Sequence, residues 1–243
     1  MKTAAIFNLK GGVGKTSCAV NLALIAAING KRTVLWDLDA QAAATWLLSG
    51  ESGDSLKKAV KSPKAIATSI SHTPYPRLDI IPASFSHRKL DSLLAGTSAF
   101  TGIAGILSTR YDLLVIDAPP SLARLADNIF RISNAVLAPV IPSPLAVRAF
   151  EQLRSYVEKR KNPPVLRAFL SMVDRRRKQH EQWLIDAPDA LRGVLLRNYI
   201  PYSSAVERMS IRGVPLLASQ PGHPVAKRYV GLWDELSALL HAR

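Results

Sequence analysis

The sequence predicts an α/β fold, a doubly wound and mostly parallel sheet with helices on both faces. Three observations support it. Apolar runs typical of buried strands alternate with segments of helical periodicity along the 243 residues. The strand candidates are apolar throughout rather than alternating, as expected when helices cover both faces of a parallel sheet. A glycine-rich segment, residues 10–16, stands between the first strand and the first helix.

The elements are expected in a regular order. The first strand is predicted at residues 3–8 and the first helix at 17–29, with Gly30 placed to end that helix. Residues 51–74 are the most polar stretch and are expected to form a mobile surface region. Five further strands and five further helices are predicted, the strands at 32–36, 78–83, 111–117, 135–141 and 167–173, and the helices at 41–48, 87–108, 121–132, 145–160 and 178–191.

Length and composition fit a single domain over residues 1–243. No apolar run reaches the roughly 18 residues of a membrane span, so none is expected. The first residues enter the glycine-rich segment and do not resemble a signal peptide, and they leave no room for a DNA-binding module ahead of Lys10. One cysteine, Cys18, excludes an internal disulfide framework. These features predict a cytoplasmic protein.

A phosphate-binding loop is predicted at residues 10–16, which read Lys-Gly-Gly-Val-Gly-Lys-Thr. Glycines let the backbone fold tightly and bring N–H groups close to phosphate oxygens. Lys15 can reach the β- and γ-phosphates, and the Thr16 hydroxyl can bind Mg²⁺. The strict pattern of such loops is not met, because its first glycine would fall on Leu9 and an additional lysine, Lys10, precedes the two glycines.

Carboxylates close two of the predicted strands. Asp117 ends the apolar run 111–117 and can hold Mg²⁺, often through water. Asp37 and Asp39 follow the strand at 32–36. Nucleotides bind at the carboxyl ends of the strands in such sheets, so these acids are expected to face the same site as the loop.

The run Lys-Gly-Gly-Val-Gly-Lys-Thr resembles the deviant Walker A motif of the ParA/MinD family of P-loop ATPases. The resemblance implies ATP and Mg²⁺ as cofactors and a homodimer that closes around ATP. In that dimer Lys10 would reach the partner's nucleotide, whereas Lys15 would act within its own chain. The ATP-binding residues implied are Lys10, Gly11, Gly12, Val13, Gly14, Lys15, Thr16, Ser17, Met172 and Pro201.

The acidic motifs carry the same resemblance. Asp117-Ala-Pro-Pro-Ser matches the family's Walker B form, and Asp37-Leu-Asp39-Ala-Gln stands where the family usually has Asp-x-Asp-Pro-Gln. The resemblance implies that Asp39 positions or activates the attacking water and is catalytic together with Lys10. It also implies that Thr16, Asp37, Asp39 and Asp117 form the metal site. Alanines replace the common Pro at residue 40 and the common Gly-Asn at 42–43, so a different loop shape is expected there.

The net charge of +14 is high for a small ATPase. Residues 1–147 hold 15 basic and 9 acidic residues, and residues 148–243 hold 17 and 9, so the excess is denser in the shorter part. A basic face suggests a polyanion such as DNA, RNA or an anionic membrane. Because no aromatic residues interleave with the cations in the sequence, backbone contact without base stacking is expected.

Candidate DNA contacts lie in the last third of the chain. Met172-Val-Asp-Arg-Arg resembles a family segment whose arginine, here Arg176, is associated with non-specific DNA binding. Ala205 occupies the family's other usual arginine position, and Arg208 and Arg212 are the nearby candidates to replace it. The full set of predicted contacts is Arg175, Arg176, Arg177, Lys178, Arg208, Arg212, Lys227 and Arg228.

The last helix, opened by residues 227–229, could lie on a membrane, as in MinD, or pack in the core. Its acidic residues Asp234 and Glu235 favour core packing. The apolar residues at helical spacing are Val230, Trp233, Leu236, Leu239 and Leu240.

Together these features predict a ParA-type ATPase that binds nucleoid DNA non-specifically and segregates or positions a cargo. A partner protein, ParB-like or equivalent, would stimulate hydrolysis. The cargo could be a plasmid, a chromosome or a protein organelle such as the carboxysome, and residues 141–148 depart from the common chromosomal form, which favours the organelle-positioning or orphan type. Two alternatives remain open, a MinD-like membrane-associated ATPase and a metabolic P-loop ligase.

Overall fold

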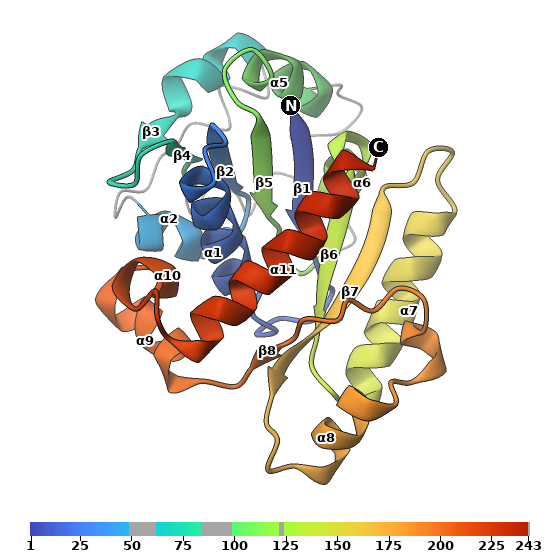
Figure 1. Ribbon diagram of the computed structural model, residues 1–243. Helices are drawn as coiled ribbons and strands as arrows, with labels where there is room; N and C mark the ends of the chain where they lie inside the picture. Colours follow the sequence, from blue (N-terminus) through green and yellow to red (C-terminus); the bar gives the residue numbers. More distant parts are fainter. Residues whose placement is uncertain (49–61, 84–98, 122–123, 243) are drawn as a thin grey trace.

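A central β-sheet organises the fold. The structure is a computed structural model that describes residues 1–48, 62–83, 99–121 and 124–242. In these ranges eight strands form one sheet in the order β3-β4-β2-β5-β1-β6-β7-β8 (Figure 1). Every pair is parallel except β3 with β4. The strands are β1 Lys2–Ile6, β2 Thr33–Asp37, β3 Ser71–His72, β4 Leu78–Ile81, β5 Leu113–Asp117, β6 Ala135–Val140, β7 Val165–Val173 and β8 Ile200–Pro201.

Helices cover both faces of this sheet, which confirms the predicted layers. Figure 1 shows α1 and α11 crossing the face nearest the viewer. The α-helices are α1 Lys15–Ile28, α2 Ala43–Leu48, α5 Ala99–Leu107, α6 Arg124–Ile132, α7 Pro144–Glu158, α8 Lys178–Ile185, α9 Ser204–Arg212, α10 Leu216–Ser219 and α11 Pro224–His241. The described residues also form two 3₁₀ helices, η1 Pro63–Ser69 and η3 Asp189–Leu191.

Two hydrophobic cores lie on opposite faces of the sheet. Successive residues of a strand point to opposite faces. Ala4 and Ile6 of β1 accordingly pack with α1 and α11, whereas Ala5 and Phe7 pack with α5, α6 and α7. Because each strand buries both sets of side chains, its sequence is apolar without alternation, which is the pattern that identified these strands.

The register of the sheet brings two acidic residues together at the carboxyl ends of its parallel strands. Asp37 at the end of β2 lies beside Asp117 at the end of β5. Ile6, the last residue of β1, pairs with Asp117 from the other side. The chain leaves β1 at this edge, forms the glycine-rich loop and enters α1. Gly30 adopts φ +84° directly after α1 and ends it as predicted.

Several predicted boundaries need correction. The helix predicted at 178–191 ends at Ile185, because Pro188 disfavours helical geometry in the residue before it and the chain restarts as the short η3. Part of the polar stretch 51–74 is ordered structure, since η1 buries Ile66 and β3 extends the sheet. Residues 51–61 of that region, and 87–98 of the predicted helix 87–108, lie outside the described residues.

The last helix packs in the core. Trp233, Leu236 and Leu240 are buried in the cluster that includes α1, as predicted, whereas Val230 is exposed. No helix in the described ranges is both long enough and apolar enough to cross a membrane.

Candidate active site

The loop between β1 and α1 is held in place by β7. Gly12 and Gly14 adopt φ +68° and +89°, a region that favours glycine. The Ser171 hydroxyl donates a 2.8 Å hydrogen bond to the Val13 carbonyl. A Cβ on Gly14 would stand 3.1 Å from the same hydroxyl oxygen, closer than ordinary contact. A side chain at residue 14 would therefore push the loop away from the strand that braces it.

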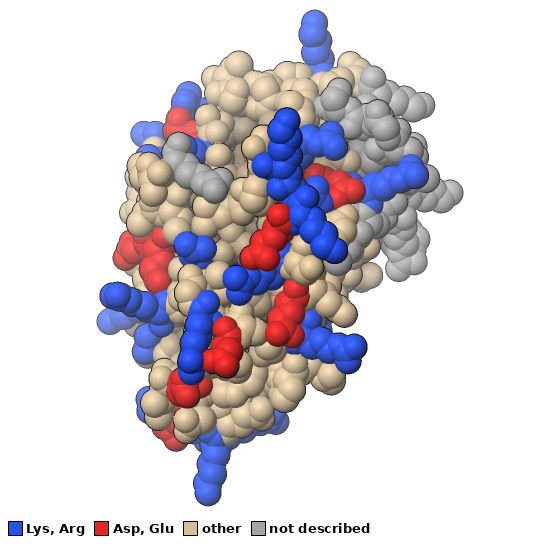
Figure 2. All heavy atoms as spheres, turned by 90° about the vertical axis from the view of Figure 1, so that its right-hand side faces the viewer, with Lys and Arg blue, Asp and Glu red and all other residues tan. Residues whose placement is uncertain are grey.

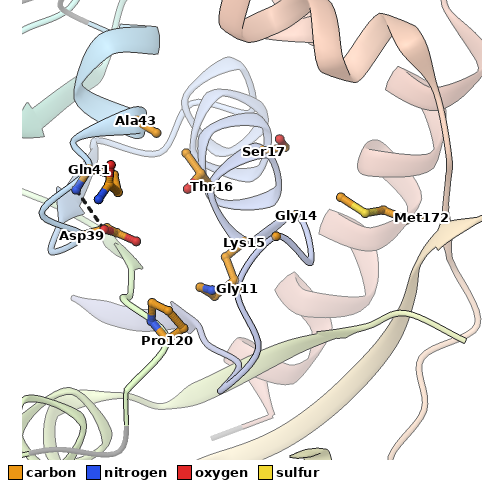
Figure 3. A pocket seen from close by; sticks show the side chains of 11 residues that line it. Gly11, Gly14, Lys15, Thr16, Ser17, Asp39, Gln41, Ala43, Pro120 and Met172 are labelled. Atoms are coloured by element: carbon orange, nitrogen blue, oxygen red, sulfur yellow. Dashed lines mark hydrogen bonds between the residues drawn. The ribbon is translucent and has the colours of Figure 1, made fainter. Parts of the chain in front are cut away.

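A cleft of about 540 Å³ opens over this loop. Figure 3 shows Lys15 and Asp39 extending into the space between the loop and the β2–α2 connection, with Thr16 above them. Of the predicted ATP-binding residues, Lys10 and Val13 are not part of the lining, and Pro201 lines a second cavity described below. The lining consists of Gly11, Gly12, Gly14, Lys15, Thr16, Ser17, Asp39, Gln41, Ala43, Pro120 and Met172.

The two loop lysines have different environments. The Lys15 side chain is buried, and its Nζ donates a 3.2 Å hydrogen bond to the Lys10 carbonyl. Burial lowers the pKa of Lys15, while the nearby carboxyls of Asp117 and Asp39 act in the opposite direction. Lys10 is exposed, and its backbone N–H is held by the Asn8 carboxamide at 2.9 Å. Lys15 is thus directed into the cleft, whereas the Lys10 side chain is accessible from outside the molecule.

Asp117 lies beneath the loop with unsatisfied oxygens. It is 1 % exposed, and neither carboxylate oxygen has a hydrogen-bond partner within the described parts of the chain. Burial and the neighbouring Asp37 raise its pKa well above the ordinary value. The Thr16 hydroxyl lies beside it and opposes this shift, although not in full hydrogen-bond geometry. A buried carboxylate with free acceptors next to a hydroxyl fits a hard cation such as Mg²⁺.

Protein side chains alone do not form a complete metal cage. No group of three or more His, Cys, Asp or Glu side chains in the described ranges is placed to hold a metal. Mg²⁺ in phosphate-binding sites is usually held by one or two protein oxygens together with substrate phosphates and water. The donor set of Asp117 and Thr16 matches that mode.

Asp37 is fully buried and already hydrogen-bonded. Its Oδ2 accepts from the Thr45 N–H at 2.9 Å and from the Thr45 hydroxyl at 2.7 Å, and its Oδ1 accepts from the Asp39 N–H at 3.1 Å. Burial raises the pKa of Asp37 to about 6, although the hydrogen bonds from Thr45 and Asp39 oppose this shift. Asp37 does not line the cleft, so the structure places it behind Asp39 rather than beside it.

Asp39 lines the cleft on a tight turn. Its Oδ1 accepts a 2.9 Å hydrogen bond from the Gln41 N–H, drawn dashed in Figure 3, and its carbonyl accepts one of 2.9 Å from the Ala42 N–H. Ala42 adopts φ +52°, in the left-handed region. This is a position where the sequence has alanine in place of a common glycine, and the backbone holds a conformation that glycine adopts readily and alanine tolerates poorly. The different loop shape expected from the sequence stays a prediction.

A second, smaller cavity of about 40 Å³ adjoins the loop on the other side. It brings the predicted residues Met172 and Pro201 together with Gly14 and Ser17. Met172 has φ +55° at an irregularity in the pairing of β7 with β8, and its side chain reaches toward the loop (Figure 3). The structure thus brings two of the predicted ATP-binding residues to this side of the loop, although the cavity itself is smaller than a purine base.

The four predicted cations after β7 are exposed, three of them in a turn and Lys178 at the start of α8. Two are paired with acids, Arg176 with Asp174 at 2.9 Å and Arg175 with Glu181 at 3.3 Å. Arg177 and Lys178 have no ion pair among the described residues. The turn is anchored from below by His180.

His180 is buried beneath this turn. Its Nδ1 accepts a 3.0 Å hydrogen bond from the Asp174 N–H. Burial lowers the pKa of His180, Arg177 acts in the same direction, and Asp174 opposes them. The neutral ring required for this acceptor role is therefore the favoured form.

The other candidate cations lie on α9 and α11, and the fold places aromatic rings beside some of them. The Arg228 guanidinium lies 4.5 Å from the centre of the Tyr199 ring. Trp46, 55 % exposed, donates its indole N–H to the Ser210 carbonyl at 3.1 Å, next to Arg212 on α9. Two aromatic rings from distant segments thus lie near these cations, and the expectation of backbone contact without base stacking stays a prediction.

On one side of the molecule, basic and acidic side chains are mixed. Figure 2 shows the side that carries α7, where acidic side chains lie among the lysines and arginines. The ion pair of Arg154 with Glu158 belongs to this helix. Such mixed charge does not favour a polyanion on this side.

Three residues that shape the site had no predicted role in it. Asn8, Thr45 and Ser171 hold the loop and the acidic turn through buried hydrogen bonds. Asn8 and Ser171 are polar residues within the mainly apolar runs predicted as strands, 3–8 and 167–173. Such a polar residue in an apolar run can be recognised from the sequence. Thr45 carries no such signal, because its partner lies in another element.

Comparison with known proteins agrees with this geometry. A family model described as an AAA domain matches residues 1–172. A ParA family protein of Chlamydia muridarum is 29 % identical over 252 residues, with 99 % of each chain covered.

Two solved structures share the fold. Apo McdA of Cyanothece has a TM-score of 0.82 at 20 % identity, covering 97 % of this chain and 99 % of its own. The septum site-determining protein MinD of Pyrococcus horikoshii, complexed with Mg-ADP, has a TM-score of 0.76 at 19 % identity, covering 97 % and 95 %. From the matched model, the relative and the loop with its leading lysine, the chain belongs to the ParA/MinD family of P-loop ATPases.

Proposed function

We propose that this chain is a ParA-type ATPase that hydrolyses ATP with Mg²⁺, dimerises on ATP and uses that cycle to segregate or position a cargo. The observation that carries the proposal is the cleft itself, where Lys15 and Asp39 line one space above the buried, unpartnered Asp117. A cation, a half-buried carboxylate that lines the cleft and a buried carboxylate that can hold a metal, all at one phosphate loop, are the parts needed for attack of water on a γ-phosphate.

Each residue of the site has a separate proposed role. The loop N–H groups and the Lys15 ammonium hold the β- and γ-phosphates. The Asp39 carboxylate accepts a hydrogen bond from the attacking water and orients it. Thr16 and Asp117 hold Mg²⁺, and Asp37 supports that site from behind Asp39. When bound, the metal neutralises charge that builds on the phosphate oxygens.

Lys10 supports the dimer. Its side chain is exposed and does not line its own cleft. In a two-fold sandwich it would reach the partner's γ-phosphate, where a cation stabilises the charge of the transition state. Met172 and Pro201, on the smaller cavity, would lie near the adenine.

The proposed polyanion is DNA, bound through its backbone without sequence readout and placing the protein on the nucleoid. The exposed cations after β7 and on α9 and α11 support it. A membrane helix of the MinD type is disfavoured, since α11 buries Trp233, Leu236 and Leu240. An adaptor protein would stimulate hydrolysis and so release the ATPase from DNA.

Replacing Lys15 tests the nucleotide site. Lys15→Ala removes the buried cation, and ATP affinity should fall on the order of 100-fold, the loss of about 3 kcal/mol of charge-assisted hydrogen bonding. The measurement is isothermal titration with ATP and Mg²⁺. Lys64→Ala, an exposed lysine on η1, should leave the affinity unchanged. Retained ATP affinity in folded Lys15→Ala would remove the basis for the proposal.

A further inference from the structure

Thr45 lies at the centre of a buried hydrogen-bond network behind the cleft. It is 2 % exposed on α2, and Asp37 and Ala83, its neighbours in the network, are both fully buried. The Thr45 hydroxyl donates to Asp37 Oδ2 at 2.7 Å and accepts from the Ala83 N–H at 2.9 Å. The Thr45 N–H donates to the same Asp37 oxygen at 2.9 Å. The hydroxyl proton is therefore directed to one acceptor.

This network fixes the orientation of Asp37. Two donors from Thr45 hold one carboxylate oxygen, which leaves the other oxygen aimed at the Asp39 N–H, 3.1 Å away. Thr45 also belongs to the first turn of α2, whose backbone N–H groups have no partner within the helix, so Asp37 satisfies one of them from another element. Asp37 thus joins the end of β2 to the start of α2.

The turn between these elements needs such support. Asp39 stands on it, and Ala42 in the same turn has φ +52°, a conformation unfavourable for alanine. Within the described ranges the Asp39 carboxylate accepts one hydrogen bond, from the Gln41 N–H in the same turn. The direction of that carboxylate therefore depends on how firmly the turn is attached to Asp37.

We propose that Thr45 is a positioning residue for hydrolysis, which acts through Asp37 to fix the turn that carries Asp39. The proposal rests on the proposed ATPase activity, with Asp39 as the group that orients water. Thr45 does not line the cleft, so its removal should slow the chemical step and leave ATP binding largely intact.

The test compares Thr45→Val with Thr45→Ser and Thr33→Val. Valine keeps the shape of threonine but removes the hydroxyl, whereas serine keeps it. Thr33 is also fully buried and begins the same strand, β2, with its hydroxyl on the Lys31 carbonyl. Its valine variant is the same chemical change far from the turn, and among the described residues it removes one hydrogen bond where Thr45→Val removes two. ATP dissociation constants, single-turnover hydrolysis rates and thermal midpoints are measured for all three and for the wild type.

Thr45→Val should hydrolyse ATP about 10- to 100-fold more slowly, the range expected when a catalytic group is misplaced by a fraction of an ångström to 1 Å. Its ATP dissociation constant should change less than about threefold. Thr45→Ser should recover most of the rate, and Thr33→Val should keep it despite its own loss of thermal stability. Amide hydrogen exchange of residues 38–46, measured without nucleotide, should be faster in Thr45→Val alone.

The outcomes separate the two proposals. If the wild type does not hydrolyse ATP, the proposed function fails, and the exchange measurement still reports whether Thr45 holds the turn. If the wild type is active and Thr45→Val is folded but equally fast, the positioning role is wrong. The same holds if serine fails to recover the rate or if Thr33→Val slows hydrolysis as much, because the effect would then come from packing or general stability.

Discussion

Ala42 is the residue at which the site shows a clear backbone strain. Its φ of +52° places a Cβ where a left-handed conformation costs about 1–2 kcal/mol. Met172, on the other side of the loop, has φ +55°. Strained residues of this kind collect at functional sites, where surrounding structure holds them. Both residues here contribute to the walls around the phosphate loop or to the turn beside it.

Ala42→Gly should therefore stabilise the protein by about 0.5–1 kcal/mol, because relief of strain exceeds the added chain entropy of glycine in the unfolded state. Urea unfolding of the nucleotide-free protein measures this. The adjacent Ala43→Gly is the matched control, since Ala43 begins α2 in helical geometry and should lose about 0.5 kcal/mol. A destabilised Ala42→Gly would show that residue 42 is not strained.

At the residue scale the candidate site was largely predictable. Lys15, Thr16, Asp39 and Asp117 follow from motif spacing and from the rule that strand ends share an edge. Thr45 was not predictable, because its contact with Asp37 joins a helix to a strand end and leaves no pattern in the chain.

At the scale of elements, the turn that follows β7 combines exposed charge with a rigid base. The run of four cations is visible in the sequence, but their pairing is not. Arg175 and Arg176 are partly neutralised by Glu181 and Asp174, so Arg177 and Lys178 are the stronger candidates for phosphate contact.

Replacing Arg177 and Lys178 by Gln should weaken binding to DNA of any sequence and reduce the slope of log K against log salt by about 0.9 for each lost phosphate contact. Arg208→Gln with Arg212→Gln on α9 should act similarly. Lys159→Gln with Lys161→Gln, which removes the same charge at the end of α7, should leave the slope unchanged. Fluorescence anisotropy with random-sequence duplexes in ATP measures these slopes. Equal slopes for all variants would place DNA on another face.

Elements were predicted best where a regular hydrophobic pattern extends over several residues. The six apolar strands and α1, α7 and α11 are present close to their expected places. β3 and β8 have two residues each and carry no periodic signal. Helix α8 was predicted too long, because the helical pattern of its side chains continues past the backbone break near Pro188.

At the scale of the whole molecule, one chain holds a complete cleft but directs Lys10 outward. A site whose second lysine comes from another copy should show activity that depends on association. The fold class followed from the sequence, whereas the position of the Lys10 side chain outside its own cleft required the structure.

Mixing two inactive variants tests this arrangement. Lys10→Ala retains its own Asp39, and Asp39→Ala retains a Lys10 to donate, so each alone should hydrolyse ATP poorly. An equal mixture should recover about a quarter of wild-type activity, since half of the dimers are mixed and each has one complete site of two. Hydrolysis in DNA-containing and DNA-free buffer measures it. Normal turnover by Lys10→Ala alone would contradict the exchange of Lys10.

The hydrogen bond from Ser171 to the Val13 carbonyl has a mechanical consequence. Only three residues separate Ser171 from Arg175, and the first two of them complete β7. The proposed phosphate-binding loop and the proposed DNA-binding turn are thus joined by the last residues of β7. A shift of the Val13 carbonyl should therefore reach the start of the basic turn along the backbone of β7.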